Sequence, residues 1–421
     1  MARKKLLFVT TRLFWPTDEG HKVLLYNYCK GLSEIYNYDI YLYSFLEEGQ
    51  DPDDGKTPDF IKKIYTAKHP SMWQKISNVL RYSFVSSEHW SFQSSMFFSK
   101  ENIANIQKLV KEIQPDTIFV DMIRLSPYFC AIEDFKGKKV LFMEDALSKR
   151  YIRQIEAASS ESGIAGRFSS RLPGFLNKLI NSKAFKNRIL TSESKRLEKE
   201  EVRAAKRYDA VIYVNEIEAN EMNQKTGRKN SFTVTQGADC DYYSAPIEVE
   251  KIPNNLSYVG NMGVAANADA VRMIMDKIMP QIPSKPIIHF IGNAPESLRD
   301  EYKNNPQCVF EGRVDDIRLS VRATEVMLSP IAYGTGVKTK VIEGMAMSMP
   351  VVTNYLGIDG LSVEVGHDLL MSDNFEEMAM MVEDLLHNPE KREELGKRGY
   401  DYAMAHHQWK DIYKVFGQMG L

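Results

Sequence analysis

The stretch that most constrains this chain runs from Gly334 to Val352 and reads GTGVKTKVIEGMAMSMPVV. It begins with a glycine-bearing turn and continues through residues 337–347 with the apolar spacing of a short helix. Pro350 ends that helix, and the valines that follow begin a buried strand. A loop, a helix and a strand in such quick succession are typical of an alternating α/β fold.

The charges at the start of this helix are unusual. Lys338 and Lys340 lie in its predicted first turn, where the helix dipole is already positive. An anion would offset both ammonium groups and would also contact the free backbone N–H groups of the helix start. Glu343 lies on the same face and either pairs with Lys340 or accepts a hydrogen bond from a sugar hydroxyl. We therefore predict a phosphate site here; the alternative is a surface helix with an incidental Lys340–Glu343 pair.

The composition excludes several classes of protein. The 421 residues, 43% hydrophobic and 26% charged, fit a globular chain of two or three domains. A net charge of −2 argues against a nucleic-acid binder. The four cysteines are far apart, so we predict no zinc site and no disulfide framework, and a reducing cytoplasm fits. No run of about 18 apolar residues exists, and Arg12 interrupts what would otherwise resemble a signal peptide.

Short apolar runs alternate with helical segments along the chain. The predicted fold class is α/β, with two Rossmann-like doubly wound domains facing each other across a cleft. We predict domains at 1–245 and 246–396, a linker from Tyr243 to Asn255, and a last helix at about 397–421. Strands are predicted at 5–10, 38–45, 117–120, 140–143, 210–214 and 232–235 in the first half, and at 256–259, 287–291, 309–310, 326–329 and 351–352 in the second.

Several strand ends in the first half carry candidate ligand contacts. The loop at 11–20 ends at Gly20, before a helix, and is either a ligand-facing loop or a plain connection. Asp121 ends one strand, and Glu144 and Asp145 end another, so these acids are expected at one edge of the sheet. Each could orient a sugar hydroxyl or act as a base. The alternative for each is a helix cap or a solvated loop charge.

Two further segments are harder to assign. Residues 47–102 have a poor pattern, with a polar start followed by Trp73 and Trp90, and are predicted to be an insertion. Residues 163–192 contain six Lys or Arg and no Asp or Glu, with apolar residues interleaved. Such a basic amphipathic segment can lie on an anionic membrane surface. The alternative is a helix packed in the domain with its lysines in water.

The absence of several known motifs from the sequence excludes some kinds of binding site. The sequence contains no Walker A loop, no GxGxxG and no metal-ligand spacing. We therefore predict no metal and no cofactor. Two α/β halves with an anion site in the second suit a substrate with a nucleotide at one end and an acceptor at the other.

Much of the chain resembles a known family. It is similar to the retaining glycosyltransferases of group 1 (family 4), which have the GT-B fold, and most similar to the branch that assembles bacterial surface polysaccharides and exopolysaccharides. The matching segments are TTRLFWPTDEGHKVLLYNYCKGLSE, FTVTQGADCDYY, YVGNMGVAANADAVRMIMDKIMP, FEGRVDDIRLSVRATEVMLSPIAYGTGVKTKVIEGMAMSMPVVTN, GHDLLMSDNFEEMAMMVEDLL and HHQW.

This resemblance implies that the last helix, at about 397–421, packs back on the first domain. It also implies a donor site. Glu343 matches the second acid of the family's paired-Glu motif, which contacts the ribose or sugar of the donor. The remaining implied donor contacts are Gly336, Val337, Lys338 and Lys340 at the diphosphate, Gly312, Arg313 and Val314 at the base, Gly260 and Asn261 at the phosphates, and Gly20 from the other domain.

The chain departs from the family pattern at three places. Thr335 occupies the position of the first acid of the pair. Asn261 and Asn267 lie where the family's phosphate-binding Arg and Lys are expected. Asp121 occupies the region of a histidine in the first half, and is predicted as a catalytic residue together with Glu343.

The resemblance implies a metal-independent transfer of a hexose-type sugar, with retention, from a nucleotide diphosphate sugar. A UDP-sugar is expected, and a GDP-sugar is the alternative. The expected acceptor is a glycan or lipid-linked molecule of the bacterial cell surface. The expected location is cytoplasmic, with peripheral contact to the inner face of the membrane through 163–192. The alternatives are a GT-B sugar-nucleotide epimerase and a non-catalytic scaffold that binds a nucleotide sugar.

Overall fold

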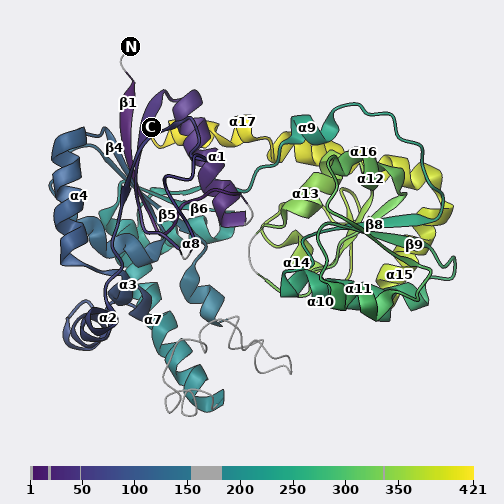
Figure 1. Ribbon diagram of the computed structural model, residues 1–421, viewed down its shortest axis with the longest axis horizontal. Coiled ribbons are helices and arrows are strands. Elements are labelled where there is room, and N and C mark those ends of the chain that lie inside the picture. The colour runs from purple at the N-terminus through teal and green to yellow at the C-terminus, as the bar shows by residue number, and fades with distance from the viewer. Residues whose placement is uncertain (1–2, 18–19, 48, 153–182, 335–336) are drawn as a thin grey trace. The chain divides into compact units, whose positions relative to one another are not determined.

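The chain folds into two compact units, each built on one parallel sheet (Figure 1). The computed structural model describes residues 3–17, 20–47, 49–152, 183–334 and 337–421. Unit 1 comprises Met1–Val234 and Tyr413–Leu421, and unit 2 comprises Thr235–Ile412. The predicted two doubly wound α/β domains are confirmed.

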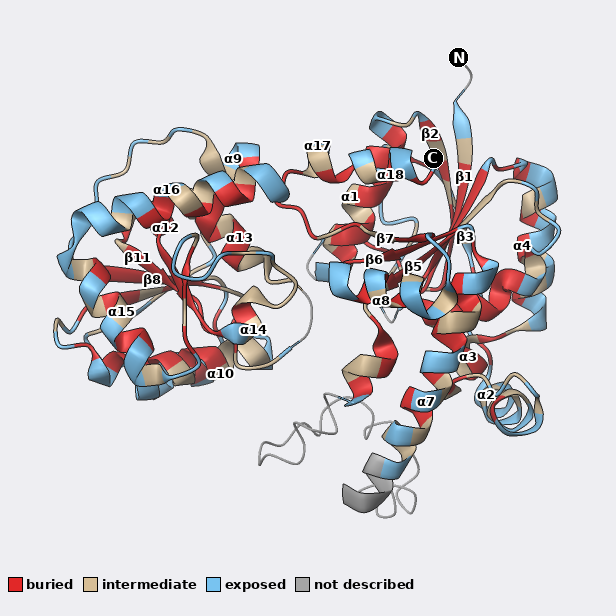
Figure 2. Ribbon diagram, turned by 180° about the vertical axis from the view of Figure 1, so that it is seen from behind, coloured by how far each residue is buried: buried red, intermediate tan, exposed pale blue. Residues whose placement is uncertain are grey.

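Unit 1 has a seven-stranded sheet in the order β3-β2-β1-β4-β5-β6-β7, with every pair parallel. The central residues of its inner strands are apolar because helices cover both faces of the sheet (Figure 2). Its strands are β1 (Lys4–Thr10), β2 (Tyr38–Ser44), β3 (Ile61–Thr66), β4 (Thr117–Asp121), β5 (Lys138–Glu144), β6 (Ala210–Tyr213) and β7 (Ser231–Thr233). Its helices are α1 (Gly20–Glu34), α2 (Met72–Asn78), η1 (Val79–Val85), α3 (Phe92–Phe97), α4 (Lys100–Ile113), η2 (Ile123–Ala131), α7 (Lys183–Arg207), α8 (Glu216–Thr226) and α18 (Lys414–Gln418).

Unit 2 has a six-stranded parallel sheet in the order β10-β9-β8-β11-β12-β13. Its strands are β8 (Asn255–Val259), β9 (Ile287–Ile291), β10 (Cys308–Gly312), β11 (Val326–Leu328), β12 (Val351–Thr353) and β13 (Leu370–Met371). Its helices are α9 (Cys240–Ser244), α10 (Ala265–Met273), η4 (Ile274–Ile278), η5 (Met279–Gln281), α11 (Glu296–Tyr302), α12 (Ile317–Ala323), α13 (Thr339–Ala346), α14 (Tyr355–Ile358), α15 (Phe375–His387), α16 (Pro389–His406) and α17 (Trp409–Ile412).

The unit boundaries differ from the predicted domain boundaries at both ends of unit 2. The first two residues of the predicted linker are the last two of a helix, α9, which packs in unit 2 because Cys240 and Ala238 join the core around α13 and α16. At the other end α16 and α17 stay with unit 2, and only 413–421 return to unit 1. There the Tyr36 hydroxyl donates to the Tyr413 carbonyl at 2.7 Å.

The membrane contact was predicted in the basic segment 163–192. Residues 163–182 of that segment lie outside the described residues. Among the helices that the structure describes, none is long and apolar enough to cross a membrane.

Candidate functional site

The sheet of unit 2 places the start of α13 beside the end of β8. The chain runs outward from β8 through β9 to β10, and then crosses to β11 on the other side of β8. The loops after β8 and β11 therefore leave the same edge of the sheet in opposite directions. Ligands of open α/β sheets bind at this kind of reversal point.

Lys340 in α13 connects this helix to β8 and α10. Its Nζ donates to the Tyr258 hydroxyl at 3.0 Å and to Asn267 Oδ1 at 2.8 Å, and lies 4.5 Å from the centre of the Tyr258 ring. Asn267 in turn donates from Nδ2 to the Asn261 carbonyl at 2.9 Å. The ammonium group is thus held by a strand residue, a helix residue and, indirectly, the loop after β8.

The charge of Lys340 is poorly compensated at this position. Burial lowers the pKa of Lys340 to about 8, although Glu343 opposes the shift, while Lys338 adds to it. Tyr258 and Asn267 are neutral and offset little of the lost hydration. A phosphate that reached this ammonium group would supply the missing negative charge.

Glycines let the loops at this edge approach closely. Gly292, at the end of β9, has φ +126°, and a Cβ atom there would lie 2.2 Å from the Gly260 carbonyl oxygen. A Cβ atom at Gly260 would lie 3.1 Å from the side chain of Asn267. The Gly292 N–H donates to the Gly312 carbonyl at 2.8 Å, which brings the end of β10 to the same edge. Gly312 itself has φ +76°, a conformation that favours glycine.

Glu343, one turn beyond Lys340 in α13, has a partner that the sequence did not reveal. The Tyr243 hydroxyl from α9 hydrogen bonds to the Glu343 carboxylate. Burial raises the pKa of Glu343, while this hydrogen bond and Lys340 act in the opposite direction. The carboxylate can accept from a sugar hydroxyl, and Tyr243 can keep it ionised.

The other predicted donor residues of unit 2 lie around this edge or outside the described residues. Lys338 is the N-cap residue of α13, one residue after the predicted start of the helix. Val337 lies beside Gly360, where a Cβ atom would be 2.9 Å from the valine side chain. Arg313 and Val314 directly follow β10. Thr335 and Gly336 are outside the described residues.

Unit 1 has its own reversal point, between β1 and β4, and a buried charge cluster lies at that edge. His21, in the first turn of α1, has its Nε2 3.1 Å from Asp121 Oδ1 and its Nδ1 3.4 Å from Glu144 Oε2. The Asp121 side chain is fully buried, and its other oxygen accepts from the Thr11 hydroxyl at 2.9 Å. Glu144 is 20% exposed and also pairs with Arg150 at 3.5 Å.

The electrostatics of this cluster are compensated. Burial alone would lower the pKa of His21, but the carboxylates of Asp121 and Glu144 outweigh it and raise the pKa to about 10. Burial likewise opposes ionisation of Glu144, but His21 and Arg150 lower its pKa to about 2. His21 is therefore a buried cation between two carboxylates. It was missed from the sequence, although it directly follows Gly20 in a loop predicted to face a ligand.

Gly20 and Asp121 thus lie in unit 1, while the remaining predicted site residues belong to unit 2. A Cβ atom at Gly20 would meet no protein atom within 4 Å. Nothing within unit 1 therefore requires glycine at this position. Within the described residues no group of three or more His, Cys, Asp or Glu side chains is arranged to hold a metal ion.

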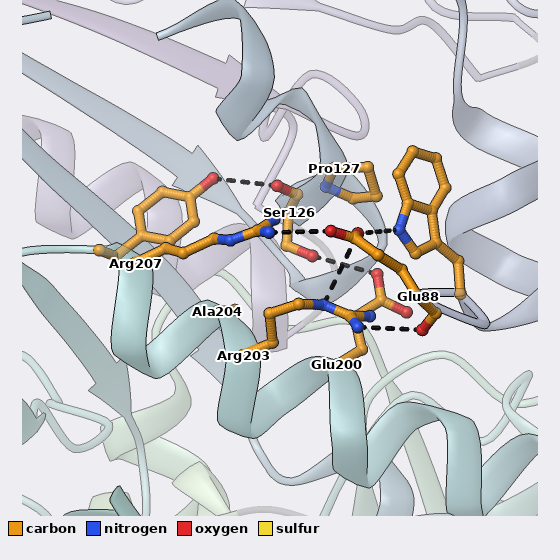
Figure 3. Close-up of a pocket in the computed structure, with 9 residues that line it drawn as sticks. Glu88, Ser126, Pro127, Glu200, Arg203, Ala204 and Arg207 are labelled. Carbon is orange, nitrogen blue, oxygen red and sulfur yellow. Dashed lines mark hydrogen bonds and ion pairs between the residues drawn. The ribbon is translucent and has the colours of Figure 1, made fainter. Parts of the chain in front are cut away.

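A small polar pocket elsewhere in unit 1 is not a candidate donor site. It lies between α7, η2 and the loop that follows η1 (Figure 3). Its charges pair with one another: Glu88 contacts Arg207 at 2.8 Å and Arg203 at 3.8 Å, and accepts from the Trp90 indole N–H at 2.6 Å. These ion pairs hold the loop after η1 against α7.

Part of unit 2 matches a known protein family. Residues 253–388 match the family model of glycosyl transferases group 1. Unit 2 contains a group 1 glycosyltransferase domain. The matched residues of this glycosyltransferase domain include Lys340, Glu343 and the loop after β8. None of the curated protein sequences matches the chain.

Solved structures share the architecture of both units. Sucrose-phosphate synthase from Thermosynechococcus elongatus superposes with a TM-score of 0.65 at 15% identity, over 99% of this chain and 98% of that one. HepE from Anabaena, in complex with UDP, gives 0.61 at 12% identity over 98% of each chain. WaaG, a glycosyltransferase involved in lipopolysaccharide biosynthesis, gives 0.57 at 12% identity over 97% and 98%. At these identities the likeness shows the GT-B fold around the glycosyltransferase domain.

Proposed function

We propose that the protein is a retaining glycosyltransferase that moves a hexose-type sugar from a nucleotide diphosphate sugar to a glycan or lipid-linked acceptor. The observation that carries this proposal is Lys340, a buried ammonium group at the reversal point of a group 1 glycosyltransferase domain, held by neutral side chains. Two negative charges on a diphosphate fit such a position. A UDP-sugar is the first candidate, because HepE, which has the same fold, binds UDP.

The leaving diphosphate would be stabilised by unit 2. The N–H groups at the start of α13, Lys338 and Lys340 supply positive potential where charge builds up as the sugar–phosphate bond breaks. Glu343 would hold a sugar hydroxyl of the donor, and the hydrogen bond from Tyr243 favours its ionised form against the effect of burial. This arrangement requires no metal ion in the proposed mechanism.

The acceptor would be handled by unit 1. Asp121 is buried behind His21, so we infer that it positions His21 rather than contacting the acceptor. Glu144 is the more exposed carboxylate of the cluster and is suited to hydrogen bond an acceptor hydroxyl. The acceptor proton would pass to a side chain or to the departing phosphate.

The cellular role follows from the acceptor class. WaaG, which shares the fold, is involved in lipopolysaccharide biosynthesis. We propose the same broad setting, bacterial cell-surface polysaccharide synthesis at the cytoplasmic side of the membrane. Residues 163–192, basic and amphipathic, are the proposed contact with anionic lipid.

The test is donor binding and turnover with a panel of UDP-, GDP- and CMP-sugars. A ligand at a hundred times its Kd stabilises a protein by about 2.7 kcal/mol, which raises the melting temperature by about 2–4 °C per kcal/mol. Lys338→Ala/Lys340→Ala should abolish the shift. Lys303→Ala/Lys397→Ala, a matched change of two exposed lysines of unit 2, should keep it.

The panel also separates the alternatives. A transferase produces a glycosylated acceptor and releases nucleoside diphosphate. An epimerase would convert the donor without any acceptor, and a scaffold would bind it without turnover. If no nucleotide sugar stabilises the wild-type protein, the assignment of Lys340 to a diphosphate is wrong.

A further inference from the structure

The helix formed by α2 and η1 has its polar side inward and its apolar side outward. Within residues 72–85, all of which the structure describes, only Ser83 is buried. Met72, Ile76, Leu80 and Phe84 follow each other at four-residue spacing, and all are exposed. A helix on the surface of a globular protein normally buries its apolar stripe. In Figure 2 α2 lies at the edge of unit 1 with little buried surface.

Specific contacts fix the polar side of this helix. The Asn78 side chain donates to the Phe98 carbonyl at 2.7 Å, and the hydroxyls of Ser83 and Ser95 lie 2.8 Å apart. Tyr82 stacks on Trp90 with ring centres 4.6 Å apart. The helix also begins with a capping box between Ser71 and Gln74. The outward direction of the apolar stripe is therefore set by the packing of its opposite side.

The exposed stripe is extended at both ends. Trp73, at the start of α2, is 82% exposed, and Val85, at the end of η1, is 80% exposed. Exposed large hydrophobic residues scattered singly need no explanation, but a continuous patch marks an interaction site. We define the α2–η1 face as Met72, Trp73, Ile76, Leu80, Phe84 and Val85.

The charges around this face indicate which partner it fits. No Asp or Glu occurs from residue 60 to residue 87, whereas Lys75 and Arg81 lie on the helix itself. Arg196, from α7, stacks at 5.0 Å from the centre of the Phe84 ring. An apolar helix face flanked by basic residues and carrying an exposed tryptophan has the features of a helix that lies in the interface of an anionic bilayer.

We propose that the α2–η1 face docks unit 1 on an anionic lipid surface, with Trp73 and Leu80 in the acyl-chain boundary and Lys75 and Arg81 at the headgroups. This contact is distinct from the basic segment 163–192. It does not depend on the proposed transferase activity, because lipid binding can be measured without donor or acceptor.

The test is sedimentation of the purified full-length protein with vesicles of phosphatidylcholine, alone or mixed with phosphatidylglycerol. The wild-type protein should bind the mixed vesicles, and salt should weaken that binding. Trp73→Ser/Leu80→Ser should reduce the affinity by at least about tenfold, through loss of buried apolar area. Ile217→Ser/Met380→Ser, which changes two similarly exposed side chains outside this face, should leave it unchanged.

Two further measurements separate the possible occupants. Quenching of tryptophan fluorescence by brominated phospholipid should disappear in Trp73→Phe, a variant that still binds. Lys75→Glu/Arg81→Glu should remove the preference for phosphatidylglycerol. Light scattering after gel filtration shows whether the face instead joins two copies of the chain.

Three results would overturn the proposal. The first is absence of wild-type binding to the mixed vesicles. The second is equal binding by Trp73→Ser/Leu80→Ser, including the case in which only changes in 163–192 remove it. The third is a dimer of the wild-type protein that Trp73→Ser/Leu80→Ser converts to a monomer. Far-ultraviolet circular dichroism checks that each variant is folded, as expected for substitutions at exposed positions.

Discussion

Donor binding should weaken as the pH rises above about 8, the pKa of Lys340, and Lys340 should be the reason. Burial among neutral partners lowers that pKa in the free protein, and a bound diphosphate should raise it again. Because the pKa is then higher in the complex than in the free protein, binding takes up a proton. Affinity is full below the pKa of the free protein and is lost as the pH rises through it.

The size of the effect follows from the protonated fraction. With a pKa of about 8, Lys340 is charged in most molecules at pH 7 and in about one tenth of them at pH 9. If only the charged form binds the diphosphate well, affinity at pH 9 is about tenfold lower than at pH 7, or about 1.4 kcal/mol. Titration calorimetry in two buffers of different ionisation enthalpy measures both the affinity and the proton uptake.

Two variants isolate the contribution of Lys340. Lys340→Arg keeps a charge that does not titrate in this range, so its affinity should lack the loss caused by the lysine. Lys340→Met should bind weakly at every pH. The base of a uridine nucleotide also titrates in alkaline solution, so wild type and Lys340→Arg are compared at each pH. If both lose affinity equally, Lys340 is only a structural partner of Tyr258 and does not contact the phosphate.

Two other substitutions test the Tyr243–Glu343 hydrogen bond of unit 2 and the His21 cluster of unit 1. Tyr243→Phe removes a hydrogen bond that lowers the pKa of Glu343, so the acid limb of the kcat/KM profile against pH should move to higher pH; an unmoved limb would separate this pair from the reaction. His21→Gln removes the cation between Asp121 and Glu144, of which, among the described residues, only Glu144 keeps an ion pair, with Arg150, and should reduce the free energy of unfolding by about 3–5 kcal/mol. The pKa of His21 is raised from 6.5 to about 10, so its contribution to the free energy of unfolding is full below pH 6.5 and is lost as the pH rises through 10. Urea titrations of wild type and His21→Gln should therefore give the same free energy of unfolding above that pH. A difference that stays constant with pH would contradict a charged His21.

The sequence revealed the buried strands better than the exposed ones. Each predicted apolar run forms a strand, because a strand covered on both faces needs apolar residues throughout. The structure adds β3, whose sequence IKKIYT contains the exposed Lys62 and Lys63. It lies at the edge of the sheet, where charged side chains are expected, and it lacks the pattern of a buried strand. The two residues of β13 are too few to show any pattern.

Residues of the candidate site could be proposed from the sequence only where one segment contained the signal. The unfavourable charge at the start of α13 is a local property, so Lys340 and Glu343 could be proposed from the sequence alone. The contact of Lys340 with Tyr258 depends on β8 and β11 being neighbours across the reversal point. The partnership of Glu343 with Tyr243 depends on α9 packing against α13, although the sequence resembled a linker there. Such contacts are set by the topology, and no local pattern predicts them.

His21 and Lys340, two of the buried cationic side chains among the described residues, show how compensation separates a scaffold from a binding site. His21 and Lys340 both lose hydration on burial, which by itself lowers the pKa of each. His21 lies within 3.4 Å of two carboxylates of unit 1, so its pKa is raised. Lys340 donates to a phenol and an amide, so its pKa stays lowered, and the free protein bears the cost of its charge. An anion that binds Lys340 would relieve that cost, whereas the carboxylates of Asp121 and Glu144 already outweigh the effect of burial on His21. The incompletely compensated charge is therefore the one we assign to the donor.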